Sequence, residues 1–202
     1  NILSLGNAAA QKFWIEDNKY LADSSHHGIH DTSVRPNQIF AIAFKYSPLT
    51  KKMGTEILKR VKKELLTPYG LRTLSPDDVH YLGRCKGSGY YRDKAYHNGT
   101  VWPWLLGFYG SALIRLSSDI QKTCKEIEQL LLPFDAHITE AGIGSISEIF
   151  DGDPPHEPRG CIAQAWSVAQ IIRLRSMVEK MKETVRSKHG SDHVSLLTAD
   201  YL

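Results

Sequence analysis

The chain contains 202 residues with a formal net charge of +3, and 42% of its residues are hydrophobic while 23% are charged. This balance supports a packed core, so it excludes a disordered chain and a collagen-like repeat. The cysteines, Cys85, Cys124 and Cys161, are widely spaced and form no C-x-x-C pair. That spacing indicates neither a disulfide framework nor a zinc knuckle, and it favours a reducing compartment.

The distribution of charged and apolar residues indicates which partners to expect. The longest apolar stretch, residues 101–116, is shorter than the roughly 20 residues that a membrane-spanning helix needs, and no signal peptide is recognisable. The densest basic segment, residues 51–63, has helical spacing, which favours a solvated helix face over a nucleic-acid surface. We therefore expect a cytoplasmic protein with neither a membrane nor a nucleic-acid partner.

Hydrophobic periodicity predicts an almost entirely helical chain. In chain order, the predicted helices cover residues 2–19, 36–46, 51–66, 102–117, 119–134 and 161–181. The first, third and fifth carry apolar residues on one face, whereas the second and fourth are apolar nearly all round and the sixth begins in the same way. The final segment, residues 182–202, is polar and is expected to be a tail of this single domain.

The alternation of one-faced and all-round apolar helices predicts an outer and an inner layer. Links from an inner to the next outer helix are short, and the opposite links are long, at residues 20–35, 67–100 and 135–160. In a ring of helical hairpins, links of one kind lie at the same end, so the three long loops are expected to gather at one mouth. We predict an all-α fold, an α/α toroid or a segment of one, with an irregular helical bundle as the alternative.

The third long loop contains an acidic residue with apolar neighbours, Glu148 in the sequence ISEIF. A carboxylate flanked in this way is expected to be held in the wall of a pocket, where partial desolvation suits it to general acid or base catalysis. Asp151 and Asp153 follow in DGDPP, a sequence in which aspartate commonly makes turn hydrogen bonds or caps a helix.

The second long loop ends in AYHNGTVWPW at residues 95–104. Aromatic faces beside hydrogen-bonding groups are suited to a sugar ring, which has apolar C–H faces and hydroxyl groups. We expect Trp102, which is nearer the loop, to contact a ligand with His97 beside it. Trp104 is expected to pack in the core.

The first long loop contains HHGIHD at residues 26–31, which suggests a metal site. We disfavour that interpretation because no helix holds the histidines at i, i+4 spacing. Arg35, Asn37 and Gln38 follow at the start of an inner helix and supply directed donors and acceptors for a polar ligand. The chain contains no glycine motif for binding a nucleotide, so no cofactor is expected.

Four segments of these loops stand out together. They are DTSVRPNQ (31–38), TPYGLRTLSPDD (67–78), YHNGTVWPW (96–104) and SISEIFDGDPPHEPRGCIAQAWSVA (145–169). In this order, they resemble motifs in the C-terminal part of glycogen debranching enzymes of the amylo-α-1,6-glucosidase type. The resemblance extends over most of the chain.

The resemblance implies a glucoamylase-like (α/α)6 toroid that hydrolyses α-1,6-linked glucose at branch points with inversion of configuration. The implied general base is Glu148. Residues implied to bind the substrate, a branched α-glucan such as glycogen or a limit dextrin, are Asp31, Arg35, His97, Trp102, Gln164 and Trp166. A non-catalytic carbohydrate-binding or scaffold module of the same fold is the alternative.

Inversion requires a second carboxyl group, about 6.5–9.5 Å from the first, to protonate the leaving oxygen. In the family this acid lies in a Trp-x-Asp motif, which the 202 residues lack. The predicted helices are also about half of what a closed (α/α)6 ring contains. We therefore expect the C-terminal half of a catalytic domain, inactive by itself and prone to self-association through exposed inner helices.

Overall fold

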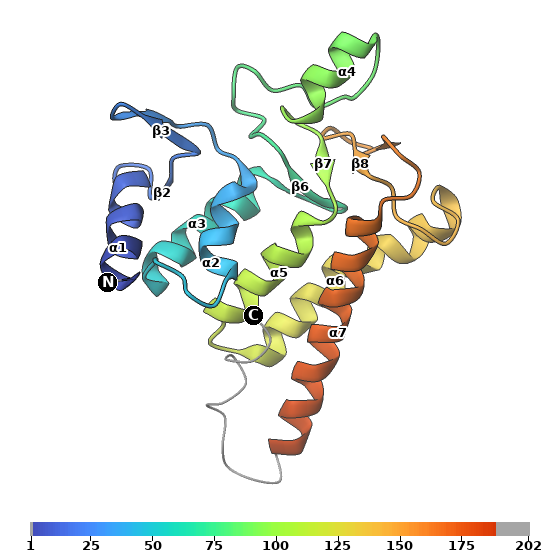
Figure 1. The fold of residues 1–202 in the computed structure, drawn as a ribbon. Helices are drawn as coiled ribbons and strands as arrows, with labels where there is room; N and C mark the ends of the chain where they lie inside the picture. Colours follow the sequence, from blue (N-terminus) through green and yellow to red (C-terminus); the bar gives the residue numbers. More distant parts are fainter. Residues whose placement is uncertain (1, 189–202) are drawn as a thin grey trace.

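Helices form most of the structure, a computed structural model that describes residues 2–188 (Figure 1). They are α1 (Ile2–Phe13), the 3-10 helix η1 (Pro36–Ile39), α2 (Phe40–Ala43), α3 (Lys51–Glu64), α4 (Gly89–Tyr96), α5 (Leu105–Leu116), α6 (Ile120–Glu140) and α7 (Ala165–Lys188). None of the helices described between residues 2 and 188 combines the length and the apolar character that crossing a bilayer demands.

The loops between the helices contain short antiparallel strands, so the prediction of an all-α fold is matched only in part. Two hairpins pair β1 (Trp14–Ile15) with β2 (Tyr20–Leu21) and β3 (Ser24–His26) with β4 (Ile29–Asp31). A five-stranded sheet joins β5 (Leu66–Thr67), β6 (Gly70–Arg72), β7 (Val101–Trp102), β8 (Ile149–Phe150) and β9 (Pro158–Arg159) in that order. Its strands are largely buried, and strand pairing supplies the hydrogen bonds that their backbone needs.

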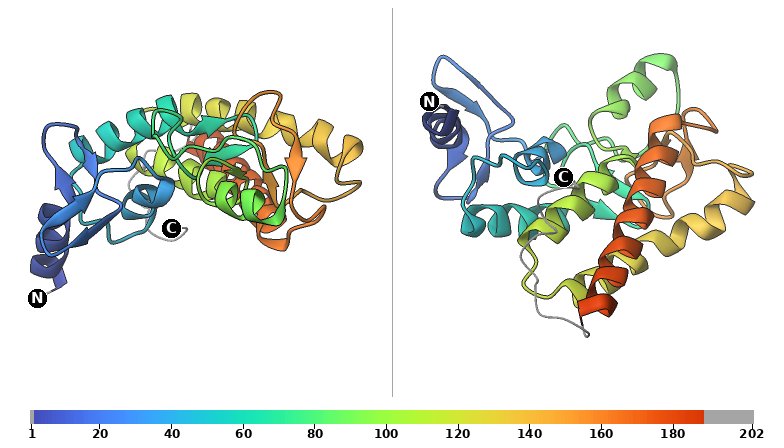
Figure 2. Two further views of the ribbon diagram at one scale, coloured as in Figure 1. Left: turned by 90° about the horizontal axis from the view of Figure 1, so that it is seen from above. Right: turned by 60° about the horizontal axis from the view of Figure 1, so that its bottom comes forward.

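The helices between the loops form two layers. α2 packs against α5, and α5 packs against α7. α3 and α6 lie along the other side of this row, where α3 contacts α5 and α6 contacts both α5 and α7 (Figure 2, left). The helices that the sequence predicts to be largely apolar all round, α2, α5 and the start of α7, therefore lie in one layer. The helices with one apolar face, α3 and α6, form the other layer.

The centre of the core is α5, whose buried positions surround the helix axis. Two glycines let α7 approach it closely. A Cβ atom at Gly107 would meet the side chain of Gln170, and one at Gly110 would meet the fully buried Leu174. The absence of side chains at these two positions explains how an apolar helix packs with a neighbour on nearly every side.

Several predicted helix boundaries differ from those in the structure. α1 ends at Phe13, because Trp14 and Ile15 pair with residues 20 and 21 in a hairpin instead of continuing the helix. The helix expected at 36–46 ends at Ala43, where the next residue has an extended backbone. α7 continues through residues 182–188, which were expected in the polar tail, and the rest of that segment lies outside the described residues.

The three long loops gather at one end of the layers, as predicted (Figure 1). The guanidinium of Arg35 in the first loop donates to the carbonyl of Thr73 and the side chain of Asn98 in the second. Arg72 in the second loop donates through Nε to the carbonyl of Gly152 in the third, at 2.9 Å. These contacts bind the loops into one mouth above α2, α5 and α7.

Candidate functional site

Glu148 is a half-buried carboxylate held by three hydrogen-bond donors. Its Oε1 accepts from the hydroxyl of Tyr96 at 2.7 Å and from Nε2 of Gln164 at 3.2 Å. Its Oε2 accepts from the backbone N–H of Cys161 at 3.0 Å. Because the donors come from α4 and from two positions in the segment before α7, the side chain is fixed from several directions.

The apolar neighbours of Glu148 explain why its backbone is fixed as well. Ile149 and Phe150 form β8, and both side chains are buried. β8 is held on one side by β7, through Val101, and on the other by β9. A carboxylate placed directly before a buried strand lies in a wall, as the sequence predicts.

The electrostatic surroundings of Glu148 keep it ionised. Burial of the side chain raises its pKa, but the donors from Tyr96, Cys161 and Gln164 outweigh burial, so the pKa lies below its ordinary value. Burial raises the pKa of Tyr96 far above the ordinary range, and the hydrogen bond to Glu148 adds to this effect. The phenol therefore remains a donor, and the pair consists of a neutral hydroxyl and a carboxylate.

Aromatic rings continue from Tyr96 towards the inner helices. The ring of His97 stacks on Trp102 with centroids 5.7 Å apart, and Trp102 meets Trp166 edge to face at the same distance. Trp102 is only 5% exposed, whereas Trp104 is partly exposed and stacks on Trp166. Trp104 packs against the core as expected but stays partly exposed, whereas Trp102, expected to contact a ligand, is the more buried of the two. Trp102 is fixed by β7 and by its Nε1 bond to the carbonyl of Tyr96.

A polar cavity of about 410 Å³ lies beside these rings. Its lining includes three of the residues expected to bind substrate, Asp31, Arg35 and His97, together with Asn37 and Asn98. A hydrogen bond from the backbone N–H of Ser33 is the main reason that the pKa of Asp31 lies below its ordinary value, so Asp31 is an ionised acceptor at the rim.

Arg35 organises the wall of this cavity. Its Nη1 donates to the carbonyls of Thr73 and His97, and its Nη2 donates to Oδ1 of Asn98 at 2.9 Å. Asp23 lies 3.8 Å from Nε. The three hydrogen bonds use both N–H groups of Nη1 and one of Nη2, and Nε faces Asp23 in an ion pair beyond hydrogen-bond distance. The second N–H of Nη2 is left for a ligand, so most of the guanidinium serves to hold the first and second loops together.

Two other acidic residues of the third loop have structural partners. Asp151 is buried and pairs with Arg159 at 3.0 Å, while its other oxygen accepts from the backbone N–H of Cys85. Asp153 accepts from the hydroxyl of Tyr81 at 3.0 Å. Both carboxylates thus have structural partners, but these partners lie elsewhere in the chain, so the expected turn hydrogen bonds or helix cap are not what holds them.

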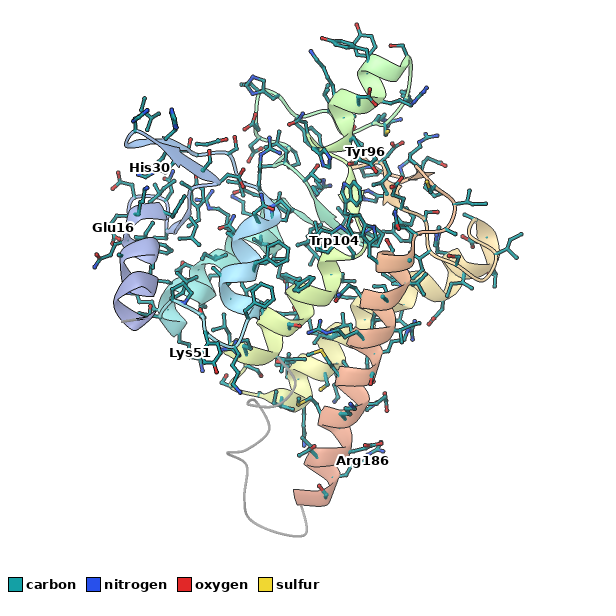
Figure 3. All side chains as sticks on the ribbon, in the orientation of Figure 1. Glu16, His30, Lys51, Tyr96, Trp104 and Arg186 are labelled. Atoms are coloured by element: carbon teal, nitrogen blue, oxygen red, sulfur yellow. The ribbon has the colours of Figure 1, made fainter. Side chains whose placement is uncertain are left out.

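The HHGIHD segment, residues 26–31, forms β3, β4 and the turn between them. His30 lies on this outer hairpin, away from Tyr96 and Trp104 at the mouth (Figure 3). Within residues 2–188 no three His, Cys, Asp or Glu side chains are grouped closely enough to hold a metal ion.

The structure brings the sequence-predicted residues together in two adjoining groups. Glu148 and Gln164 share a hydrogen bond, and Asp31, Arg35 and His97 line one cavity. Trp102 and Trp166 are linked to that cavity through the ring of His97. The residues that sequence reasoning missed are Tyr96 and the backbone of Cys161. The only signal for Tyr96 was its place next to His97 in the aromatic motif.

Comparisons with known proteins show which family this chain resembles. Residues 5–173 match the family model described as amylo-alpha-1,6-glucosidase. A glycogen debranching enzyme of Saccharomyces cerevisiae is 27% identical over 165 residues, which cover 71% of this chain and 11% of that protein. This chain therefore spans only a small part of the length of the curated relative.

A solved structure is similar in fold. Neutral trehalase from Saccharomyces cerevisiae superposes with a TM-score of 0.60 at 11% sequence identity, over 87% of this chain and 31% of that chain. The likeness is to the fold alone, and it supports the glucoamylase-like arrangement of helices expected from the sequence. Because the family model matches most of the residues, including all four loop motifs, the chain belongs to the amylo-alpha-1,6-glucosidase family.

Proposed function

We propose that this chain is part of a glycoside hydrolase that removes α-1,6-linked glucose from the branch points of glycogen-like α-glucans with inversion, and that Glu148 is its general base. The observation that carries the proposal is the Glu148 carboxylate, held by three donors and kept ionised at the mouth. A base in an inverting enzyme must be ionised when it activates the attacking water.

The hydrogen bonds of Glu148 leave room for that water. A carboxylate has about four lone-pair positions, and the bonds from Tyr96, Gln164 and the Cys161 N–H occupy two on Oε1 and one on Oε2. The Cys161 thiol also lies close enough to help lower the pKa of Glu148. The free position on Oε2 accepts a proton from water in our proposal. Gln164 and Tyr96 keep the carboxylate from rotating away during this step.

The polar cavity is proposed as the place of the glucose ring. Asp31 offers an ionised acceptor for hydroxyl groups, and Arg35 offers one donor on a rigidly held guanidinium. Trp166, which is 47% exposed, supplies an aromatic face for the sugar. We place the general acid in a part of the complete enzyme outside these 202 residues, because Asp151 and Asp153 are engaged in structural pairs.

The stereochemistry of the product tests this proposal. The complete enzyme that carries these residues is incubated with a branched limit dextrin, and the released glucose is followed by proton NMR before mutarotation. We expect β-glucose as the first product. Initial release of α-glucose would mean that Glu148 is not the base of an inverting reaction.

The Tyr96→Phe variant of the complete enzyme tests how the base is tuned. Removal of the hydroxyl takes away a donor that stabilises the charged form of Glu148, so the pKa of Glu148 rises. The acidic limb of the pH profile of kcat/KM is then expected to move to higher pH, with the larger loss of activity at acidic pH. An unchanged acidic limb would show that this hydrogen bond does not tune the base.

The exposed inner layer supports a proposal for the isolated chain. Phe44 at the end of α2 is 53% exposed, and Ile172 on α7 is 60% exposed. Exposed apolar side chains of this kind favour association. We expect the 202-residue chain alone to show a mass that rises with concentration in light scattering, and to release no glucose. A monomer with full turnover would contradict both expectations.

A further inference from the structure

We propose that His137 is a positioning residue that fixes the backbone on both sides of Glu148. This inference rests on the proposed role of Glu148 as general base and names a residue that supports it. His137 is on α6, outside every motif singled out in the sequence.

The first contact of His137 is with the residue before the base. The imidazole Nε2 accepts the backbone N–H of Ser147 at 3.1 Å. His137 and Ser147 are each only 3% exposed, so no water competes for this bond. A buried backbone N–H without an acceptor destabilises the conformation that contains it. His137 therefore favours the loop conformation in which the backbone N–H of Ser147 points towards α6.

The second contact lies on the other side of the base. The ring centroids of Phe150 and His137 are 4.8 Å apart. Tyr69 contacts both rings, and it stacks on Phe150 with centroids 4.2 Å apart and nearly parallel planes. Phe150 is buried in β8, two residues after Glu148. One imidazole thus contacts the chain just before and just after Glu148.

The protonation state of His137 agrees with this geometry. Because the backbone N–H of Ser147 can only donate, Nε2 must be the unprotonated nitrogen, and the proton lies on Nδ1. Burial lowers the pKa of His137, which keeps the ring neutral, and the charge of Glu140 on the same helix opposes this only in part. In a charged imidazolium Nε2 would carry a proton. It would then face the backbone N–H of Ser147 as a second donor, and the hydrogen bond would be lost.

A matched pair of variants of the complete enzyme tests the proposal. Glutamine can place its Oε1 near the position of Nε2, so His137→Gln keeps the acceptor, whereas His137→Leu fills the space without one. We expect His137→Leu to lower kcat by about 10- to 100-fold with KM changed by less than about threefold. His137→Gln should restore most of kcat. The amide hydrogen of Ser147 should exchange faster in the leucine variant only.

Cys124→Ala provides the control for a loss of packing alone. Cys124 is buried on the same helix but belongs to the part of α6 that lies beside Lys182 and Val185, away from the mouth. We expect Cys124→Ala to lower the melting temperature without changing kcat. If the leucine, glutamine and Cys124 variants all lose kcat to the same extent, His137 has a merely structural role and the proposal is overturned.

The failure of this inference can be distinguished from the failure of the proposed function. If Glu148→Gln abolishes hydrolysis while His137→Leu retains full kcat, the positioning role is overturned and the function stands. If Glu148→Gln leaves hydrolysis intact, Glu148 is not the base, and the inference falls with the function on which it rests. Unchanged exchange of the Ser147 amide in His137→Leu would overturn the inference even without any activity measurement.

Discussion

Replacement of Glu148 with glutamine in the complete enzyme is expected to lower glucose release from a limit dextrin by about 10²- to 10⁴-fold. An amide cannot take a proton from water at any accessible pH, so the base is lost while the shape of the side chain is kept. The Cys161 N–H can only donate, and it will therefore select the orientation in which the amide oxygen replaces Oε2. The hydroxyl of Tyr96 can rotate, and the amide of Gln164 can flip, so that each accepts from the amide nitrogen that replaces Oε1. Binding of the glucan should thus be preserved.

A matched control separates loss of the base from loss of a charge. Glu183 is exposed on α7, and Glu183→Gln is expected to leave both turnover and binding unchanged. Hydrolysis is measured as glucose released, and binding is measured by calorimetry with the same dextrin. Retention of binding together with unchanged hydrolysis in Glu148→Gln would favour the alternative of a non-catalytic carbohydrate-binding module. Loss of both would point to a disrupted fold.

Hydrophobic patterning predicts the helical layers well, because the apolar positions along a helix show which of its faces are buried. The segment that forms α5 is apolar nearly all round, and it is packed on nearly every side. The end of α1 was missed because Trp14 and Ile15 continue the apolar pattern, yet they pair with Tyr20 and Leu21. Periodicity does not distinguish a last helical turn from a short strand when both are apolar.

The five-stranded sheet could not be predicted from local sequence. Each strand has only two or three residues, too few to show the alternation that identifies a strand. Their partners are also distant in the chain, as in the pairing of Val101 with Phe150. The sheet is a consequence of the helices, which bring the second and third long loops to the same end.

In the candidate site, too, the features that depend on neighbouring residues could be predicted, and those that depend on distant residues could not. Glu148 could be predicted because its apolar neighbours lie next to it in sequence, and the family resemblance supports the same residue. The donors that fix its carboxylate could not, because Tyr96 is 52 residues away and Cys161 contributes a backbone group that any residue possesses. The burial of Trp102 was also missed, since it depends on pairing with Leu71 across the sheet.

Gly160→Ala is expected to have the second largest effect on catalysis, because a side chain at Gly160 would collide with the base. Its φ of 68° favours glycine, and a Cβ atom there would meet Oε2 and the Cβ of Glu148. The backbone before Cys161 is held by the hydrogen bonds between Cys161 and Glu148, so the carboxylate must move instead. A displacement of about 1 Å can lower the rate by roughly 100-fold. We expect a decrease in kcat of that size.

The control for Gly160→Ala is Gly144→Ala in the same loop. Gly144 has a φ of 81°, and a Cβ atom there would meet nothing within 4 Å. Both variants therefore introduce alanine in the left-handed region, which costs about 1–2 kcal/mol of stability, but only Gly160→Ala displaces Glu148. Steady-state kinetics and thermal unfolding of the complete enzyme are measured for both. Equal losses of kcat would mean that backbone strain, and not contact with the carboxylate, limits the rate. A loss confined to Gly160→Ala would show that the exact place of Oε2 controls the reaction.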